Sequence, residues 1–271
     1  MMSGLEFTEG QVERYSRNIL LSEIGGGGQK KLLGSNVFMV GAGGLGSPAL
    51  LYLAAAGIGK IGVADGDDVE LSNLQRQIIH RTPDVGKSKT VSAEAAIHKL
   101  NPDCEVEIYS NRLDMKNIRE VIHGYNLVLD GSDNFPTRYM VADACWLEGI
   151  PLVSAASVRF QGQLMTLVPG DGNPCYRCIF PEPPPPGSVP SCQEAGVLGA
   201  VVGVMGTLQV VEAVKVLLGI GDILSHKLLI YDALNSRFMT VKRSLDPECP
   251  LCGLSRSITE PTELEAYCTT G

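Results

Sequence analysis

A glycine-rich heptapeptide, VGAGGLG at residues 40–46, is the first stretch of this sequence whose spacing suits chemistry. It matches the pattern G-x-G-x-x-G, with Gly41, Gly43 and Gly46 in the glycine positions. Such glycines make a tight turn, let phosphate oxygens approach the backbone, and pack a following helix against a sheet. Asp65 ends the next apolar run, where a carboxylate can bind ribose hydroxyls. These residues predict a nucleotide site and leave ATP, NAD and flavin open.

The polar run DGDDVELSNLQRQ at 65–77 favours a triphosphate over a dinucleotide. The planar guanidinium of Arg76 can clamp a phosphate, and the amides of Asn73 and Gln77 can donate to neighbouring oxygens. Lys89, in the motif VGKSK, adds a mobile positive charge. The alternative is an exposed polar loop followed by a surface lysine. We expect ATP, because its phosphates need this concentration of cations and amide donors.

A third polar segment, DGSDNF at residues 130–135, follows another apolar run. The carboxylates of Asp130 and Asp133 suit Mg²⁺, which bridges one or two carboxylates to phosphate oxygens. Asp133 or Asn134 could instead cap the helix expected to follow. The two interpretations are compatible with each other.

Four of the eight cysteines form two C-x-x-C pairs, Cys175/Cys178 and Cys249/Cys252, with seventy residues between the pairs. Four thiolates suit a closed, structural Zn²⁺ site without an open position for water. The alternative is a thioredoxin-like redox pair, but neither pair lies between a strand and a helix in the required way. The spacing therefore predicts one Cys₄ zinc site that the fold must assemble from two halves.

Strand-like and helix-like segments alternate between residues 36 and 156. The apolar, β-branched runs lie at 36–41, 60–65, 105–110, 126–131 and 151–156. This alternation predicts an α/β fold, a Rossmann-like and mostly parallel sheet with helices on both faces. Ligands of such sheets bind at the carboxyl ends of the strands, where Gly41, Asp65 and Asp130 lie.

The pattern changes after residue 156. The runs RFQGQLMTLVP, HKLLIYDA and RFMTVKR predict strands that extend the sheet in antiparallel fashion, and a proline-rich crossover occupies about residues 181–195. An apolar helix is expected at 196–219. Its uncharged part ends near Leu208, short of the ~20 residues that span a bilayer, so we expect a buried helix.

Composition narrows the class of partner. Of 271 residues, 44% are hydrophobic and 19% charged, which is typical of a folded soluble protein. The net charge of −8 argues against nucleic acid as a partner. The first residues show no secretory signal, so we expect a cytoplasmic protein with reduced thiols and no membrane partner.

Several motifs together resemble those of a known family. They are RYSRNILLSEIGGGGQ (14–29), the glycine loop, SNLQRQ, VGKSK, DGSDN, the first C-x-x-C pair, AGVLGAVVGVMGTLQVVEAVK and the second C-x-x-C pair, in this order across about residues 9–253. The sequence resembles the ThiF/MoeB/HesA family, relatives of the ubiquitin-activating enzymes. We accordingly divide the chain into an N-terminal helical segment for dimer and ATP contacts (1–35), an adenylating domain (36–254) and a polar tail (255–271).

The resemblance implies an adenylyltransferase that uses Mg·ATP. In this family the C-terminal Gly-Gly carboxylate of a small ubiquitin-like sulfur carrier attacks the α-phosphate, giving an acyl-adenylate and pyrophosphate. A separate sulfur donor then forms a thiocarboxylate for thiamine or molybdopterin biosynthesis. The alternative is a related enzyme that adenylates a small-molecule or tRNA carboxylate. No side-chain base is expected, because the attacking carboxylate is already ionised.

Residue roles follow from the resemblance by position. Arg17 matches an arginine that reaches the ATP of the neighbouring subunit, which implies a homodimer. Cys192, near the expected start of the long helix, matches a cysteine of sulfur transfer or of a covalent carrier link. The expected catalytic residues are Arg17, Arg76, Lys89, Asp133 and Cys192; the expected nucleotide-binding residues are Gly41, Gly43, Gly44, Asp65, Ser72, Asn73, Gln75, Arg76, Gln77, Lys89, Asp133 and Asn134.

Overall fold

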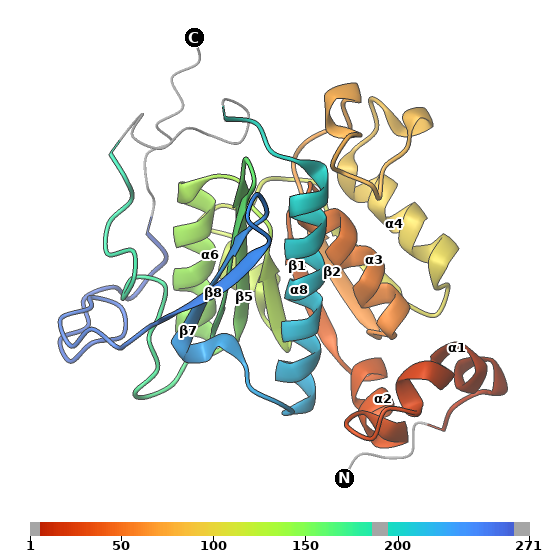
Figure 1. The fold of residues 1–271 in the computed structure, drawn as a ribbon, viewed down its shortest axis with the longest axis horizontal. Coiled ribbons are helices and arrows are strands. Elements are labelled where there is room, and N and C mark those ends of the chain that lie inside the picture. Colours follow the sequence, from red (N-terminus) through yellow and green to blue (C-terminus); the bar gives the residue numbers. More distant parts are fainter. Residues whose placement is uncertain (1–5, 186–194, 263–271) are drawn as a thin grey trace.

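A single mixed sheet forms the centre of the computed structural model, which describes residues 6–185 and 195–262 (Figure 1). Its strand order is β3-β2-β1-β4-β5-β6-β7-β8. Strands β1 to β5 are parallel to one another, and β6, β7 and β8 continue the sheet from β5 in antiparallel fashion. The strands are β1 (Asn36–Val40), β2 (Lys60–Ala64), β3 (Glu105–Tyr109), β4 (Leu127–Asp130), β5 (Leu152–Val158), β6 (Gln161–Leu167), β7 (Lys227–Asp232) and β8 (Arg237–Lys242).

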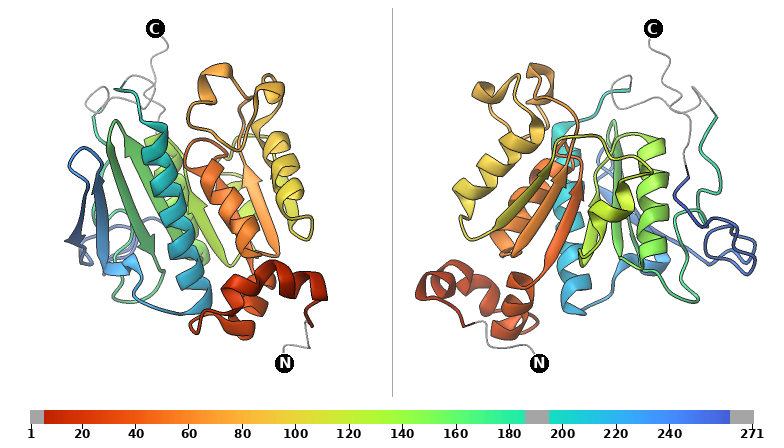
Figure 2. Two further views of the ribbon diagram at one scale, coloured as in Figure 1. Left: turned by 45° about the vertical axis from the view of Figure 1, so that its right-hand side comes forward. Right: turned by 180° about the vertical axis from the view of Figure 1, so that it is seen from behind.

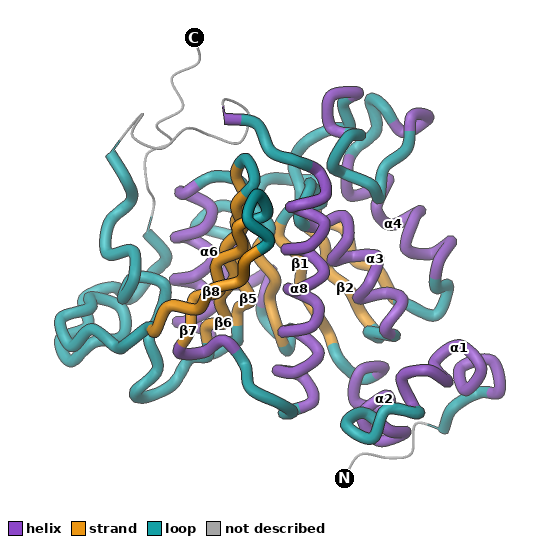
Figure 3. Tube along the Cα trace, in the orientation of Figure 1, coloured by secondary structure: helices purple, strands orange, loops and turns teal. Residues whose placement is uncertain are grey.

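Helices cover both faces of this sheet (Figures 2 and 3). On one face lie α3 (Gly46–Ala56), α4 (Lys89–Leu100) and α8 (Gly199–Leu218); on the other lie α5 (Ile118–Ile122) and α6 (Phe135–Glu148). The arrangement confirms the predicted Rossmann-like α/β fold with an antiparallel extension. Short 3₁₀ turns complete the chain: η1 (Leu71–Asn73), η2 (Thr82–Asp84) and η3 (Leu224–His226).

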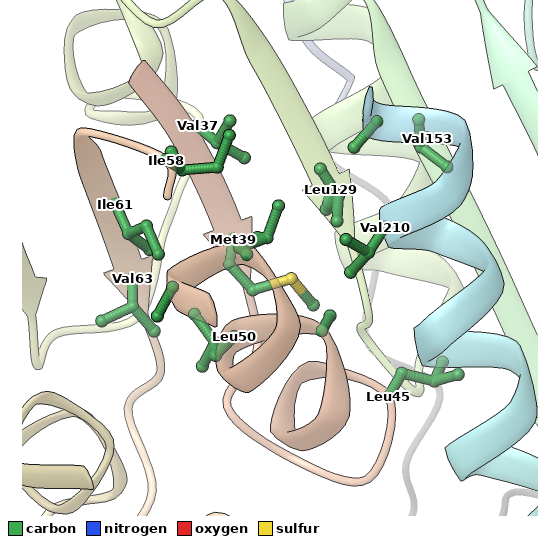
Figure 4. Close-up of a cluster of buried hydrophobic side chains, with 14 of the residues drawn as sticks. Val37, Met39, Leu45, Leu50, Ile58, Ile61, Val63, Leu129, Val153 and Val210 are labelled. Carbon is green, nitrogen blue, oxygen red and sulfur yellow. The ribbon is translucent and has the colours of Figure 1, made fainter. Parts of the chain in front are cut away.

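The central strand β1 shows why both faces must be covered. Val37 and Met39 point into the core beneath α3 and α8, whereas Phe38 and Val40 point into the core beneath α5 and α6. Successive side chains of a strand alternate between faces, so a continuous apolar run feeds two cores at once. Figure 4 shows the first of these cores, with Leu50 of α3 and Val210 of α8 packed over the strands.

Helix α8 is shorter than the predicted segment 196–219, since it begins at Gly199. By length and composition alone it is the one helix in the described part of the chain that could cross a membrane. However, it packs against the sheet and buries Glu212, whose carboxylate accepts from Thr166 Oγ1 (2.6 Å) and from the backbone N–H of Leu224 (2.8 Å). A charged side chain held in this way identifies α8 as a core helix of a globular domain.

Helices α1 (Glu9–Ile19) and α2 (Gly25–Leu33) lie at the amino ends of the parallel strands, at the lower edge of Figure 1. Tyr15 anchors α1, because its side chain is buried and its hydroxyl accepts from Asn101 Nδ2 at 2.9 Å. The same amide group donates to Ala54 O at 2.7 Å. The N-terminal helices are thereby fixed to the ends of α3 and α4 that are remote from the glycine loop.

The start of the polar C-terminal tail packs on the domain. The backbone N–H groups of Ser257 and Ile258 donate to Pro250 O (2.8 and 3.0 Å), and that of Thr262 donates to Asp143 Oδ2 (3.2 Å). Glu260 forms an ion pair with Arg119 of α5 (2.9 Å). These contacts attach residues 255–262 to α5, α6 and the second C-x-x-C pair.

Candidate nucleotide and metal sites

The carboxyl ends of β1, β2 and β4 meet at one edge of the sheet. Successive parallel strands lie on opposite sides of β1, so this edge is the point where the strand order reverses. Open α/β sheets bind their ligands at such points. The N–H of Gly41 donates to Ala64 O (2.8 Å), and the N–H of Gly131 donates to Val40 O (2.9 Å). These bonds join the ends of the three strands directly.

The glycine loop turns in the way its spacing predicts. Gly41 has a φ of +90°, which side chains disfavour. A Cβ at Gly46 would lie 1.9 Å from Gly41 O, so only glycine permits this close return of the chain. An ideal Cβ at Gly43 would lie 3.7 Å from Gln77 Nε2, and an ideal Cβ at Gly44 would lie 3.6 Å from Arg76 Cγ. The loop and the SNLQRQ segment are therefore neighbours.

Asp65, the predicted ribose ligand, is held by the backbone. Its Oδ2 accepts from the N–H of Ala42 (2.8 Å), and its Oδ1 accepts from the N–H of Asp67 (2.9 Å). Burial raises the pKa of Asp65, while the charge of Lys89 and these two N–H groups act in the opposite direction. A carboxylate oriented in this way retains lone pairs for the hydroxyls of a ribose.

Lys89 is the first residue of α4, and its side chain is only 8% exposed. Its ammonium lies 3.0 Å from Asp67 Oδ2, and Arg112 approaches the other oxygen of Asp67 at 3.3 Å. Burial acts to raise the pKa of Asp67, but the hydrogen bond and charge of Lys89, followed by those of Arg112, lower it. A buried cation thus lies at the same sheet edge as the glycine loop.

The SNLQRQ segment forms a tightly bonded turn around η1. Asn73 accepts from the N–H of Glu70 (3.2 Å) and donates to Ser72 Oγ (3.3 Å), while Arg76 donates to Ser72 O (3.1 Å). The side chain of Gln77 is buried, and its Oε1 has no hydrogen-bond partner. A buried polar atom without a partner is costly and is typical of a site that a ligand completes.

Helix α8 supports both loops from the same side. A Cβ at Gly206 would lie 2.4 Å from Leu45 O, and a Cβ at Gly199 would lie 2.4 Å from Gln75 O. The backbone of α8 therefore contacts the glycine loop and the SNLQRQ segment closely. The side chain of Gln75 is exposed beside this contact.

The two aspartates of the DGSDN segment differ in their surroundings. Asp130 is fully buried, and its carboxylate accepts from the N–H of Ser132 (2.9 Å) and from Ser154 Oγ (3.1 Å). This burial disagrees with the expectation that Asp130 binds a metal directly. Asp133 is exposed at the crevice, and Asn134 caps α6 by accepting from the N–H of Thr137 (2.9 Å). Only Asp133 has the accessibility that a magnesium ligand needs.

Arg17 lies apart from the other predicted site residues. It is exposed in the last turn of α1, at the opposite end of the sheet from the glycine loop (Figure 1). The structure therefore brings together the glycine loop, Asp65, Arg76 and Lys89, but not Arg17.

The two C-x-x-C pairs meet in a second site. The four Sγ atoms lie within 4.8 Å of one another, at 3.4 Å for Cys175–Cys249, 3.2 Å for Cys178–Cys252 and 3.9 Å for Cys175–Cys178. Sulfur atoms around a tetrahedral zinc ion are separated by about 3.8 Å, given a Zn–S distance of ~2.3 Å. The cluster is thus capable of holding a metal ion.

The four thiols differ in acidity: a hydrogen bond with Cys252 raises the pKa of Cys175 strongly, and burial raises that of Cys178 to about 11, whereas the pKa of Cys252 is lowered. The hydrogen bond from Cys175 is the main cause that lowers the pKa of Cys252 to about 5. The N–H of Asp246 donates to Cys178 Sγ at 3.4 Å. Arg243 is buried nearby and donates to Pro174 O (2.9 Å). Donors and a cation around four sulfur atoms match the second sphere that metal thiolates require.

The remaining cysteines fall into two groups. Burial raises the pKa of Cys104 to about 12 and raises that of Cys145 well above its usual value. Both are buried packing residues. Cys192 lies outside the described residues.

Sequence reasoning missed several residues of the nucleotide edge. His80 is buried between the glycine loop and α4, Arg112 shares Asp67 with Lys89, and Ser154 holds Asp130. None belongs to a motif with a recognisable spacing. Their roles arise from contacts between distant segments.

The sequence matches known proteins along most of its length. Residues 15–251 match the ThiF family. A SAMP-activating enzyme E1 of Haloferax volcanii is 53% identical over 243 residues, covering 90% of this chain and 89% of that protein. A sulfur carrier protein adenylyltransferase of Thermus thermophilus is 48% identical over 270 residues, covering 97% and 99%.

The fold also matches solved structures. The MccB protein of E. coli, solved with MccA-N7isoASN, superposes with a TM-score of 0.78 at 25% identity, covering 89% of this chain and 74% of MccB. This agreement extends over the sheet and the helices on both of its faces. With the family match and the two relatives, it establishes that this protein belongs to the ThiF family.

Proposed function

We propose that this protein is an ATP-dependent adenylyltransferase that activates the C-terminal Gly-Gly carboxylate of a small ubiquitin-like sulfur carrier. The observation that carries the proposal is the meeting of the glycine loop, Asp65, Arg76 and buried Lys89 at one sheet edge. The names of the Haloferax and Thermus relatives agree with it. Nothing in the structure favours a small-molecule or tRNA carboxylate instead.

Different residues are assigned to the ribose and to the phosphates of the nucleotide. We assign the ribose to Asp65, whose carboxylate is already oriented by two N–H groups. Arg76 and Lys89, with the amide of Asn73, neutralise the phosphates, and the N–H groups of the glycine loop approach them closely. We assign the remaining members of the predicted set, Ser72, Gln75, Gln77 and Asn134, to the same nucleotide site; Ser72, Gln75 and Asn134 are exposed, and Gln77 lies next to the glycine loop.

The chemistry requires positioning and charge neutralisation more than acid–base catalysis. A carboxylate oxygen of the carrier attacks the α-phosphorus, forming a P–O bond while the bond to the β-phosphate oxygen breaks and pyrophosphate leaves. Both reactants are anions, so Arg76 and Lys89 lower the barrier by offsetting the charge that accumulates. The nucleophile carries no proton, so no side chain is assigned as a base.

Two metal ions fit residues of the chain. Asp133 offers an exposed carboxylate for Mg²⁺, which would screen the phosphate charge when bound with ATP. The Cys175, Cys178, Cys249 and Cys252 cluster fits Zn²⁺ in charge, number and separation. Four protein ligands leave no open position, so we assign the zinc a structural role.

A hollow beside the crevice suits the carrier's C-terminus. About 520 Å³ of space lies between the turns β5–β6 and β7–β8, lined by Arg159, Phe160 and Leu234. These turns lie at the same edge of the sheet as the carboxyl end of β5. The neighbouring strand β8 exposes Phe238 and Met239. We propose that the carrier docks over β8 and extends its tail past this hollow to the glycine loop.

A homodimer with shared sites explains the position of Arg17. Its guanidinium is exposed at the far end of the sheet, so it cannot serve the nucleotide of its own subunit. Leu20 and Leu21, next to it in sequence, are 73% and 51% exposed. Exposed leucines beside a functional arginine suit a subunit interface. We propose that Arg17 reaches the ATP of the partner subunit.

Sulfur transfer forms the second half of the proposed function. We assign it to Cys192 and to a separate sulfur donor, in the reducing cytoplasm. Cys192→Ala is expected to leave ATP–pyrophosphate exchange within about twofold of the unchanged protein. It should abolish any covalent adduct between this chain and the carrier, as seen by intact-protein mass spectrometry. Equal loss of both activities would place Cys192 in the first step instead.

The adenylation step is tested by pyrophosphate exchange. Labelled pyrophosphate should enter ATP only when a carrier ending in Gly-Gly is present. Mass spectrometry of candidate carriers after incubation with ATP and a sulfide source would then identify the carrier. Failure of every Gly-Gly carrier to support exchange would refute the proposed function.

A further inference from the structure

His80 lies at the centre of the nucleotide edge without belonging to any motif. Its side chain is 4% exposed. Nε2 lies 3.0 Å from Ala42 O in the glycine loop, and Nδ1 lies 2.9 Å from Ser92 Oγ in the first turn of α4. The imidazole therefore connects the glycine loop to the helix that carries Lys89.

The partners of His80 fix its tautomer. A carbonyl oxygen can only accept, so Nε2 must carry the proton that is donated to Ala42 O. Burial lowers the pKa of His80, which favours the neutral ring. In a neutral ring Nδ1 is then an acceptor, and the hydroxyl of Ser92 donates to it. The carbonyl of Ala42 thus fixes the tautomer, and the hydroxyl of Ser92 satisfies the other ring nitrogen.

This bond controls the direction of the next amide. A trans peptide is planar, so the N–H of Gly43 points away from the carbonyl of Ala42. His80 binds that carbonyl, so the N–H of Gly43 points to the opposite side of the peptide, away from His80. An N–H in this direction is a donor for phosphate oxygens. Ala42 is fixed on its other side as well, since its own N–H binds Asp65.

The same contacts close into a ring. Lys89 donates to Asp67, and the N–H of Asp67 donates to Asp65. Asp65 accepts from Ala42, and Ala42 accepts from His80. Ser92 completes the ring, because it lies one turn after Lys89 on α4. Asp65 keeps its two backbone donors, Ala42 and Asp67, without His80, so within this ring the imidazole acts on the Ala42 carbonyl and not on the ribose ligand.

We propose that His80 is a positioning residue for nucleotide phosphates, which acts by holding the Ala42 carbonyl so that the N–H of Gly43 faces the bound anion. The inference rests on one part of the proposed function, the binding of ATP. It does not depend on the carrier protein. Its signature is selective: binding of the phosphates depends on His80, and binding of the nucleoside does not. A residue that only stabilised the fold would affect both or neither.

The experiment compares ATP and adenosine binding by calorimetry, with no carrier present. His80→Leu removes the donor and should raise the Kd for ATP by about tenfold or more, the effect of losing an oriented hydrogen bond to an anion. The Kd for adenosine should change by less than about twofold. His80→Gln can place its Nε2 donor near Ala42 O and should restore most of the ATP affinity. His98→Leu, at an exposed histidine of α4, is the matched control.

The outcomes separate the inference from the proposed function. A folded His80→Leu protein that binds ATP normally, or that loses ATP and adenosine equally, would overturn the role of His80. If His80→Leu does not fold, His80→Met, which also lacks a donor, decides: a raised Kd for ATP alone supports the role, and unchanged binding overturns it. An unchanged protein that binds no ATP would refute both proposals. ATP binding without carrier-dependent exchange would refute only the proposed function.

Discussion

The nucleotide edge and the Cys₄ cluster are both assembled from distant segments, yet their physical character is opposite. At the nucleotide edge, buried Lys89 pairs with Asp67, and the side chains of Asp67 and Arg112 are exposed to solvent. In the cluster, Cys175, Cys249 and Cys252 are buried, and the sulfur atoms face one another. An open site can exchange substrate and product, whereas a closed one can only hold what it binds. The difference predicts that damage to one region lowers activity and damage to the other lowers stability.

The largest effect is expected from Lys89. Lys89→Ala should lower kcat/KM for pyrophosphate exchange by about a thousandfold, because it removes a buried cation from two reacting anions. Its stability cost is about 1–3 kcal/mol, because the buried stem of Lys89 is lost while half-exposed Asp67 keeps Arg112. Exchange kinetics and a melting curve measure both. Lys99→Ala, an exposed lysine on the same helix, is the control, and equal activity of the two variants would contradict the assignment.

The Cys₄ cluster should show the reverse pattern. Cys249→Ser is expected to lose the metal and to lower Tm by roughly 10 °C or more, because a structural zinc contributes folding free energy directly. Elemental analysis should find about one zinc per unchanged chain. Cys104→Ala, which alters a buried thiol away from the cluster, should retain the metal. A metal-free protein with the normal Tm would refute the zinc assignment.

A subunit-mixing experiment sharpens the comparison by testing whether the nucleotide edge of one subunit needs Arg17 of the other. Arg17→Ala and Arg76→Ala should each be nearly inactive. After subunit exchange, about a quarter of the sites should recover, because one site of each mixed dimer is intact. Mixing Arg76→Ala with Lys89→Ala should restore nothing, since both residues serve the same subunit's site. If exchange activity recovers in neither mixture, Arg17 does not act in the active site of the partner subunit.

How much the sequence could predict depended on the range of the interactions. The strands, the glycine loop and the sheet edge follow from local patterns, and the Cys₄ cluster follows from thiol chemistry. The start of α8 does not follow from local patterns, because Gly196 adopts a φ of +74° and Val197 pairs with Arg159 before the helix begins. His80 was missed for a similar reason: a lone histidine after two isoleucines carries no signal until the fold brings it to Ala42.

Pyrophosphate exchange with a matched pair of carriers tests the central claim most directly. One carrier ends in Gly-Gly, and the other lacks only the two glycines. The account predicts rapid exchange of labelled pyrophosphate into ATP with the first carrier and background exchange with the second. Exchange that proceeds equally with both, or with neither, would contradict it.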